Sequence, residues 1–409
     1  MEVIKGLLPP QITFQAQLTW WIWWIGGTGY GLSEHVREAY GFLAHNYHPG
    51  DDTHPADTIH LLGFSRGAYT ARSICGLICR FGLLTKKGMD SFHEIYDYYK
   101  DGTDRKDPGY APPLASLIPW TSRTNSVENS LVSKLRARQD GKFVIPNVEI
   151  ETICCWDTVG SLGIPSLGLP IIGNWISGIE HRKYSFHDTG LLPGVKHAFH
   201  ALALDERRRH FQPTLWKKTE ETKDADLKQC WFPGVHSNIG GGFDDQEIAD
   251  MTLAWMMQQL LPFLEFDDNY LDNIIRNCDM HSEGQWATGK IYDDTWTQWL
   301  LNWGGKTRKL GVDDSTEETW IMWLLGWGGK TETEKLGVDD STKETIHKSV
   351  RVRNEFDPEW SKGALRGWTW SEDGYWTKGS KRIGQDELGS LEKKLAGKAV
   401  VRDQIKKDL

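Results

Sequence analysis

The sequence predicts an α/β fold, a mostly parallel sheet flanked by helices. Short apolar runs typical of buried strands alternate along the chain with stretches of helical periodicity, and one strand-like run meets a helical stretch at a serine between two glycines. The composition agrees, since 39% of the 409 residues are hydrophobic and 25% are charged, as in globular proteins. The length allows one large domain with an appendage, or two domains.

Three elements are predicted before residue 80. We expect a helix over 34–48, a short buried strand over 57–64 and a second helix over 66–79. In the second helix, small apolar side chains recur at helical spacing, which favours a face that lies flat on a sheet. A strand followed at once by such a helix is the unit from which parallel sheets are built.

Further elements are predicted between residues 148 and 235. The run 148–156 is strongly strand-like, and 228–235 is a weaker strand because Pro233 lies in it. The stretch from His197 to His210 has the pattern of a helix. These elements continue the alternation that indicates a parallel sheet.

We expect the main domain to span 26–265. Within it, 100–142 is polar and rich in Pro, Ser and Arg, which predicts a surface insertion. Residues 164–195 combine Gly, Pro and apolar side chains, which suits a cap over a site. The apolar side chains could form the wall that contacts an acyl chain, and ordinary core packing explains them equally well.

The two ends of the chain differ from this domain and hold most of its 21 tryptophans. Residues 1–25 form an atypical N-terminal segment, and 266–409 form an irregular, Trp-rich extension. The extension contains a tandem duplication, in which 299–319 recurs as 323–345. Two copies are too few for a solenoid, so we expect a local duplication rather than a repeat fold.

Charge and hydropathy exclude several classes of protein. The net charge of −9 argues against general binding of nucleic acid, which requires a basic surface. The longest apolar run near the N-terminus, 18–25, is too short to span a bilayer and lacks a basic leader. Six cysteines without recurring metal-type pairs indicate free thiols in a reducing compartment. We therefore expect a soluble cytoplasmic protein without a transmembrane segment.

The strongest local motif is Gly63-Phe64-Ser65-Arg66-Gly67, a G-x-S-x-G between the predicted strand and helix. On such a turn, glycines relieve crowding around a serine at strained backbone angles. The N-terminus of the following helix favours negative charge that develops beside the serine. Ser65 is thus the candidate nucleophile, and a tight turn without chemistry is the alternative.

A serine nucleophile needs a base and an acid that orients it, in the chain order Ser, acid, His for this type of turn. Asp157 follows the strand 148–156 and emerges where ligands gather in open sheets. His236 follows the weaker strand and precedes three glycines. We expect His236 as base and Asp157 as acid. Asp205 is the alternative acid, unless it is a helix-surface carboxylate paired with neighbouring arginines.

No cofactor or metal is expected. The glycine-rich run 26–31 lacks the Lys-Ser/Thr of a phosphate-binding loop. The acidic pairs at 244–245 and 313–314 do not have the ligand pattern of a calcium loop.

Four motifs together resemble one family. They are GFSRGAYTAR (63–72), WDTVGSLG (156–163), HALALDERRRHFQP (200–213) and WFPGVHSNIGGGF (231–243). In this order they are similar to the α/β-hydrolase family of type VI secretion phospholipase effector catalytic domains, and to its fungal members in particular. A weaker similarity to fungal relatives lies at 345–353. The resemblance covers roughly 26–265.

The resemblance implies an α/β-hydrolase-like fold and a serine esterase or lipase that acts on lipid or other carboxylic esters. By motif, Ser65 resembles the nucleophile and His236 the base, and the backbone N–H of Arg66 is the expected oxyanion donor. Substrate is the only partner implied, with protein partners unknown and peripheral contact with a membrane left open.

One departure from the family defines a second hypothesis. Members usually begin with a strand and an Asp-Gly-Thr segment, and residues 1–25 match neither. We therefore expect either a truncated chain or a catalytically impaired variant that lacks a strand and the second oxyanion donor. The alternative to an enzyme is a hydrolase-fold scaffold whose Trp-rich tail makes contacts.

Overall fold

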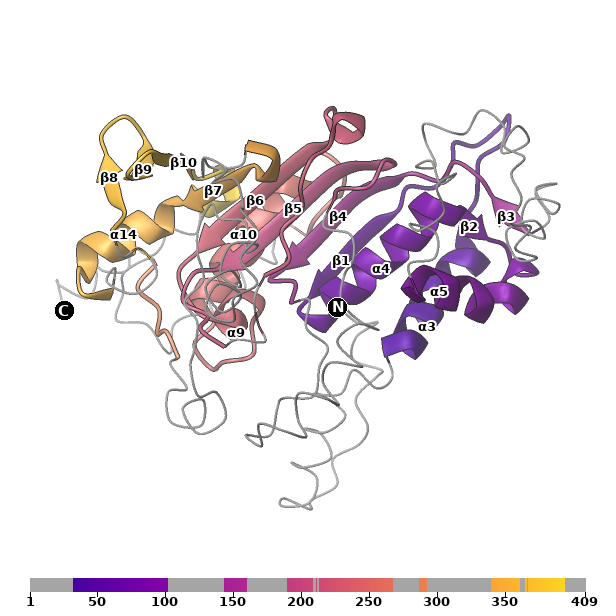
Figure 1. Ribbon diagram of the computed structural model, residues 1–409, viewed down its shortest axis with the longest axis horizontal. Helices are drawn as coiled ribbons and strands as arrows, with labels where there is room; N and C mark the ends of the chain where they lie inside the picture. The colour runs from indigo at the N-terminus through magenta and orange to yellow at the C-terminus, as the bar shows by residue number, and fades with distance from the viewer. Residues whose placement is uncertain are drawn as a thin grey trace, which may run out of the picture.

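The computed structural model describes the sheet and the helices packed on it (Figure 1). The described residues are 32–101, 143–159, 190–208, 211, 213–267, 287–292, 340–360, 365 and 367–393. The predicted segment 1–25, most of the insertion and of the candidate cap, and nearly all of the duplication lie outside these residues.

One large sheet organises the described part of the chain. Its eight strands lie in the order β1-β4-β5-β6-β7-β10-β9-β8. Neighbours from β1 to β10 pair in parallel, and only the β10–β9 and β9–β8 pairs are antiparallel. The strands are β1 His60–Phe64, β4 Ile150–Trp156, β5 Val195–Ala203, β6 Asp226–Phe232, β7 Glu344–His347, β8 Thr369–Ser371, β9 Tyr375–Lys378 and β10 Lys381–Asp386. This confirms the predicted mostly parallel sheet.

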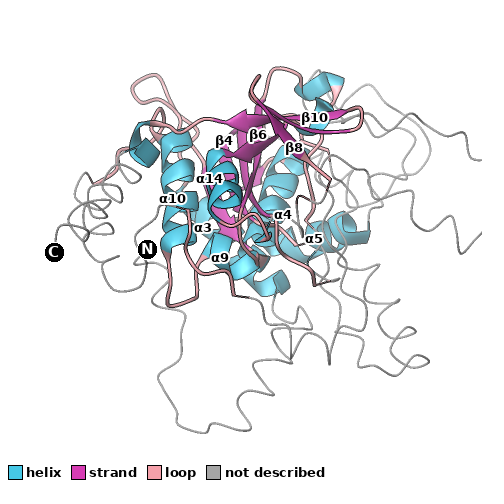
Figure 2. Ribbon diagram, turned by 90° about the vertical axis from the view of Figure 1, so that its left-hand side faces the viewer, coloured by secondary structure: helices cyan, strands magenta, loops and turns pink. Residues whose placement is uncertain are grey.

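Helices cover both faces of the sheet (Figure 2). They are α3 Leu32–Asn46, α4 Arg66–Phe81, α5 Phe92–Asp101, α9 His236–Gly240, α10 Glu247–Leu260 and α14 Lys348–Phe356. A small two-stranded antiparallel sheet joins β2 Leu83–Leu84, just after α4, to β3 Val144–Ile145. The described 3-10 turns are η1 Gly88–Ser91, η4 Glu220–Thr222 and η7 Asp340–Thr342.

Successive side chains of a strand pack alternately into two hydrophobic cores, one on each face of the sheet. In β4, Ile153 and Cys155 pack into the cluster with α3, α4 and α5, whereas Cys154 packs into the cluster with α9 and α10. A strand buried on both faces is a continuous apolar run, which is why 148–156 was predicted well. The arrangement of sheet and helices is that of an α/β-hydrolase-like fold.

The stretch from His197 was predicted as a helix, and this prediction was wrong. Residues 195–203 form β5, which pairs in parallel with β4 on one side and β6 on the other. Ala198 packs on one core and Phe199 on the other, the alternation of a strand. Two ladders of backbone hydrogen bonds here override the helical propensity of the alanines.

The sheet continues past residue 265, where we expected the main domain to end. β7 lies beside β6, with Ile346 in register with Trp231, and β10, β9 and β8 extend the sheet from there. Figure 1 shows this C-terminal group at the end of the sheet opposite α4 and α5. Leu202, Trp231, Ile346 and Trp376 share one buried cluster, so the described part of the extension belongs to the same core.

Candidate active site

Three loops leave the sheet at the same edge. β1, β4 and β6 end at Phe64, Trp156 and Phe232, and Phe64 lies in register with Trp156. The carboxyl ends of parallel strands meet at one edge, where ligands bind in open α/β sheets. The residues that follow these strands therefore converge.

Ser65 occupies a strained turn between β1 and α4. Its backbone has φ 57° and ψ −117°, and its N–H donates to the carbonyl of Trp156 at 3.0 Å. Strain of this kind costs on the order of 1–3 kcal/mol and gathers at functional sites. A Cβ on Gly63 would lie 2.3 Å from the carbonyl oxygen of Gly67, whereas one on Gly67 would meet nothing within 4 Å. Of the two glycines expected to relieve crowding, only Gly63 does so.

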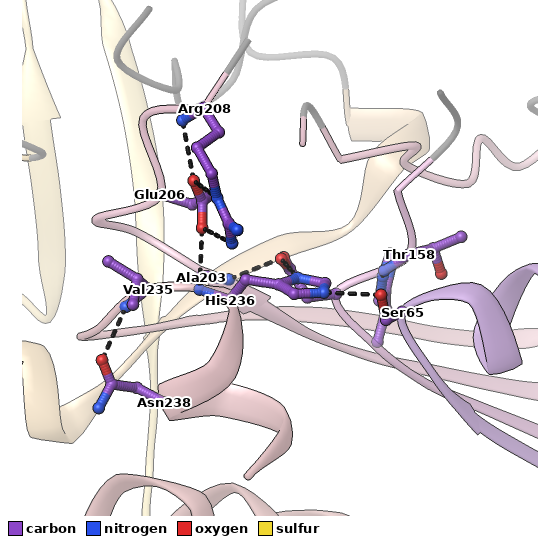
Figure 3. Close-up of polar contacts among 10 residues, drawn as sticks. Ser65, Thr158, Ala203, Glu206, Arg208, Val235, His236 and Asn238 are labelled. Atoms are coloured by element: carbon purple, nitrogen blue, oxygen red, sulfur yellow. Dashed lines mark hydrogen bonds and ion pairs between the residues drawn. The ribbon is translucent and has the colours of Figure 1, made fainter. Parts of the chain in front are cut away.

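A chain of short hydrogen bonds joins Ser65 to His236 and Asp157, which we call the elbow trio. His236 Nε2 lies 2.7 Å from Ser65 Oγ, and His236 Nδ1 lies 2.6 Å from Asp157 Oδ2 (Figure 3). A carboxylate can only accept, so Nδ1 carries the proton and Nε2 accepts from the serine hydroxyl. Asp157 is fully buried and His236 is 4% exposed, whereas Ser65 is half-buried.

The backbone around Asp157 fixes its carboxylate. Asp157 Oδ1 accepts from the N–H of Ala203 at 3.1 Å, while its own N–H donates to the carbonyl of Ala201 at 2.8 Å. The residue has φ 46°, a conformation uncommon for a side chain of this kind. One oxygen is thus held by β5 and the other faces the imidazole.

Asp205 contacts the main chain two residues before His236, rather than the imidazole. Asp205 Oδ2 accepts from the N–H of Gly234 at 2.7 Å and from Nε1 of Trp360 at 3.1 Å. Burial raises the pKa of this carboxyl, although the hydrogen bonds oppose the shift. The expected surface helix around Asp205 is wrong, because the residue follows β5 in a loop and is largely covered.

Side chains that the sequence analysis did not single out surround the imidazole. The ring of Phe64 lies 4.7 Å from that of His236, and the ring of Phe211 meets it edge-on at 4.9 Å. Gly240 admits Phe64, since a Cβ there would lie 2.1 Å from the Phe64 ring. Phe64 lies within the motif 63–72 and Phe211 within the motif 200–213, but neither motif indicates by itself that its phenyl ring packs against His236.

The N-terminus of α4 adjoins the nucleophile. α4 begins at Arg66, directly after Ser65. The first N–H groups of a helix have no partner within the helix and carry partial positive charge. The backbone of Arg66 therefore lies where an anion that develops at Ser65 would be stabilised.

Within the described residues, no group of three or more His, Cys, Asp or Glu side chains is placed to hold a metal ion.

Among the described helices, none is both long enough and apolar enough to cross a bilayer.

A second Ser–His–acid arrangement follows β7, and we call Ser349, His347 and Glu392 the buried trio. His347 Nε2 lies 2.7 Å from Glu392 Oε1, and His347 Nδ1 lies 2.7 Å from Ser349 Oγ. The N–H of Ser349 also donates to His347 Nδ1, so the imidazole caps α14. His347 and Ser349 are fully buried, and Glu392 is 1% exposed.

Comparison with known proteins agrees with the expected family. The model of the family described as "T6SS, Phospholipase effector Tle1-like, catalytic domain" matches residues 13–259. The match begins before residue 26, so it includes half of the segment that we expected to depart from the family. A phospholipase family of this kind supports hydrolysis of the lipase or phospholipase type.

One curated relative is similar over most of the chain. Uncharacterized protein YEL023C of Saccharomyces cerevisiae is 21% identical in an alignment 385 positions long, and the alignment covers 70% of this chain and 53% of that protein. The chain therefore spans about half the length of the relative. No solved structure matches the chain.

Proposed function

Because the chain belongs to the family of Tle1-like phospholipase effector catalytic domains, we propose that it is a serine hydrolase that cleaves carboxylic esters of lipids or phospholipids. The observation that carries the proposal is the hydrogen-bond chain of the elbow trio at a half-buried serine on a strained turn, with 2.7 Å from serine to imidazole and 2.6 Å from imidazole to carboxylate. These distances lie within the reach required of a nucleophile, a base and its orienting acid.

The reaction starts when Ser65 Oγ attacks the ester carbonyl and gives its proton to His236 Nε2. Asp157 holds the imidazole in the tautomer that can accept this proton and stabilises the imidazolium. The tetrahedral intermediate collapses, the ester C–O bond breaks, and the alcohol leaves with the proton from Nε2. A water molecule then hydrolyses the acyl-enzyme by the same proton transfers in reverse.

The backbone N–H of Arg66 supports the negative oxygen of the tetrahedral intermediate. In hydrolases with a G-x-S-x-G turn, this donor is the residue after the nucleophile. Removal of one such donor costs about 10²–10³ in rate. The start of α4 adds the positive end of a helix dipole to the same position.

A fluorophosphonate probe tests the proposal, because it reacts with serines that are activated as nucleophiles. We expect labelling of the folded chain and no labelling of Ser65→Ala or His236→Ala. Failure of the probe to label folded protein, or equal labelling of Ser65→Ala, would contradict the proposal. That result would favour the non-catalytic scaffold instead.

A further inference from the structure

Two side chains of the loop after β5, Glu206 and Arg208, are linked to the main chain of His236, the base of the elbow trio. Glu206 Oε2 accepts from the backbone N–H of His236 at 3.2 Å. Arg208 donates two hydrogen bonds to the same carboxylate, from Nε to Oε1 at 2.9 Å and from Nη2 to Oε2 at 2.8 Å. Figure 3 shows Arg208 and Glu206 stacked next to the backbone of His236.

Burial gives these contacts their strength. Glu206 is 1% exposed, so its charge needs a fixed partner, and a forked arginine–carboxylate pair is the strongest that side chains offer. The backbone N–H of Arg208 also donates to Glu206 Oε1, at 2.8 Å. The Arg208 side chain is about 25% exposed, so a substitution there disturbs the packed core less than one at Glu206.

Arg208 is linked to the imidazole by a second route. Its guanidinium lies 3.5 Å from the centre of the Phe211 ring, and that ring lies nearly perpendicular to the ring of His236, with 4.9 Å between their centres. The backbone of His236 is thus held through Glu206, and its ring is packed by Phe211. Both contacts depend on where Arg208 lies.

The turn before His236 needs such support. Gly234 has φ +111°, which only glycine adopts readily, and His236 opens a helix of five residues. A short helix after a glycine fixes its first residue weakly by itself. A shift of about 1 Å in a catalytic group can cost on the order of 10² in rate.

We propose that Glu206, held by Arg208, is a positioning residue for the imidazole of His236. Glu206 acts through the main chain and Arg208 through Glu206 and Phe211, so neither touches the substrate ester. The inference rests on the proposed hydrolase function.

The test compares Glu206→Gln, Arg208→Ala and Arg208→Lys with the wild type. We would measure the rate constant of fluorophosphonate labelling from pH 5 to 9, kcat and KM on a small aryl ester, and the urea midpoint of unfolding. Glu355→Gln is the matched control, because it breaks an exposed ion pair with Arg351 far along the chain.

We expect Glu206→Gln and Arg208→Ala to lower the labelling rate and kcat by about 10- to 100-fold, with KM within twofold. Arg208→Lys should recover part of the loss, since it keeps the charge but not the fork. The control should match the wild type.

The outcomes separate this inference from the proposed function. A wild type that does not label overturns the proposed function, and the inference with it. A wild type that labels, with an unchanged labelling rate in Glu206→Gln and Arg208→Ala, overturns the inference alone. A loss that only follows the unfolded fraction also overturns it. Arg208→Ala and Arg208→Lys decide the matter if Glu206→Gln does not fold.

Discussion

The elbow trio and the buried trio place the same three groups at the same edge of one sheet. Both have serine-to-imidazole and imidazole-to-carboxylate distances of 2.6–2.7 Å. They differ in three respects. In the elbow trio the serine is half-buried, has strained backbone angles and faces Nε2. In the buried trio the serine is fully buried, lies inside a helix and faces Nδ1.

This difference shows that a chain of hydrogen bonds is not by itself a catalytic site. In the buried trio, Nδ1 of His347 accepts from the N–H of Ser349 and so caps α14. The carboxylate of Glu392 also accepts from the N–H of Gly389. A substrate carbonyl cannot approach a serine with no exposed surface. We therefore assign the buried trio to stability and the elbow trio to chemistry.

The largest predicted effect separates the two serines. Ser65→Ala should lower kcat/KM for ester hydrolysis by about 10⁴-fold or more, as loss of a nucleophile does in related chemistry. Ser349→Ala should leave the activity of the folded protein within about twofold. Steady-state kinetics on a small aryl ester measure both. Equal losses from the two substitutions would break the distinction.

The next prediction concerns the two candidate acids of the elbow trio. Asp157→Asn should lower kcat by about 10⁴-fold, because the amide favours the wrong tautomer of His236. Asp205→Asn should cost at most about 10²-fold, because that carboxylate holds the main chain at Gly234 and the indole of Trp360 rather than the imidazole. Parallel measurements of kcat decide between them, and a larger loss from Asp205→Asn would reverse the assignment.

The buried trio should show its effect in stability. Glu392→Ala leaves two donors without their acceptor, the Nε2–H of His347 and the N–H of Gly389. At about 1–3 kcal/mol for each buried donor, this should cost about 2–6 kcal/mol of unfolding free energy. Urea denaturation measures this, with Glu355→Ala as the exposed control, for which we expect at most about 1 kcal/mol. A stable Glu392→Ala that has lost its activity would contradict the division of roles.

A carboxyl outside both trios gives a smaller, pH-dependent effect. Burial, with Asp245 nearby, raises the pKa of Glu247 to about 7. A raised carboxyl pKa stabilises the fold below the unfolded value near 4.5, and this contribution is lost as the pH rises through 7. The loss amounts to about 3 kcal/mol at most.

Glu247→Gln should therefore make stability less dependent on pH between 5 and 8. At pH 8 the variant should be more stable than the wild type, because it buries no charge. Unfolding midpoints at pH 5 and pH 8 test this, with the exposed Glu220→Gln as control. A wild type whose stability rises over this range, together with an unchanged variant, would contradict the assignment to Glu247.

Local signals in the sequence were sufficient for part of this structure. The elbow was predictable because a strand, a G-x-S-x-G turn and a helix lie within 57–79. Asp157 followed from the apolar run of β4. His236 followed from chain order and the glycines after it. In each case the residues that determine the local conformation are neighbours in sequence.

The remaining features depend on contacts between distant residues. β5 was mistaken for a helix because its alanines favour one in isolation, and with it the contact of Glu206 with His236 was missed. The pairing of β7 with β6 joins segments more than 100 residues apart, as Gln229 with Glu344 illustrates. Local periodicity carries no information on such pairings.

The central claim is that Ser65, and not Ser349, forms an acyl-enzyme. Rapid mixing with a p-nitrophenyl ester, an acid quench and mass spectrometry of the peptides test it most directly. We predict a burst of nitrophenol followed by slower turnover, with the acyl group on the peptide that contains Ser65. An acyl group on the peptide that contains Ser349, or hydrolysis without any adduct and undiminished in Ser65→Ala, would contradict it.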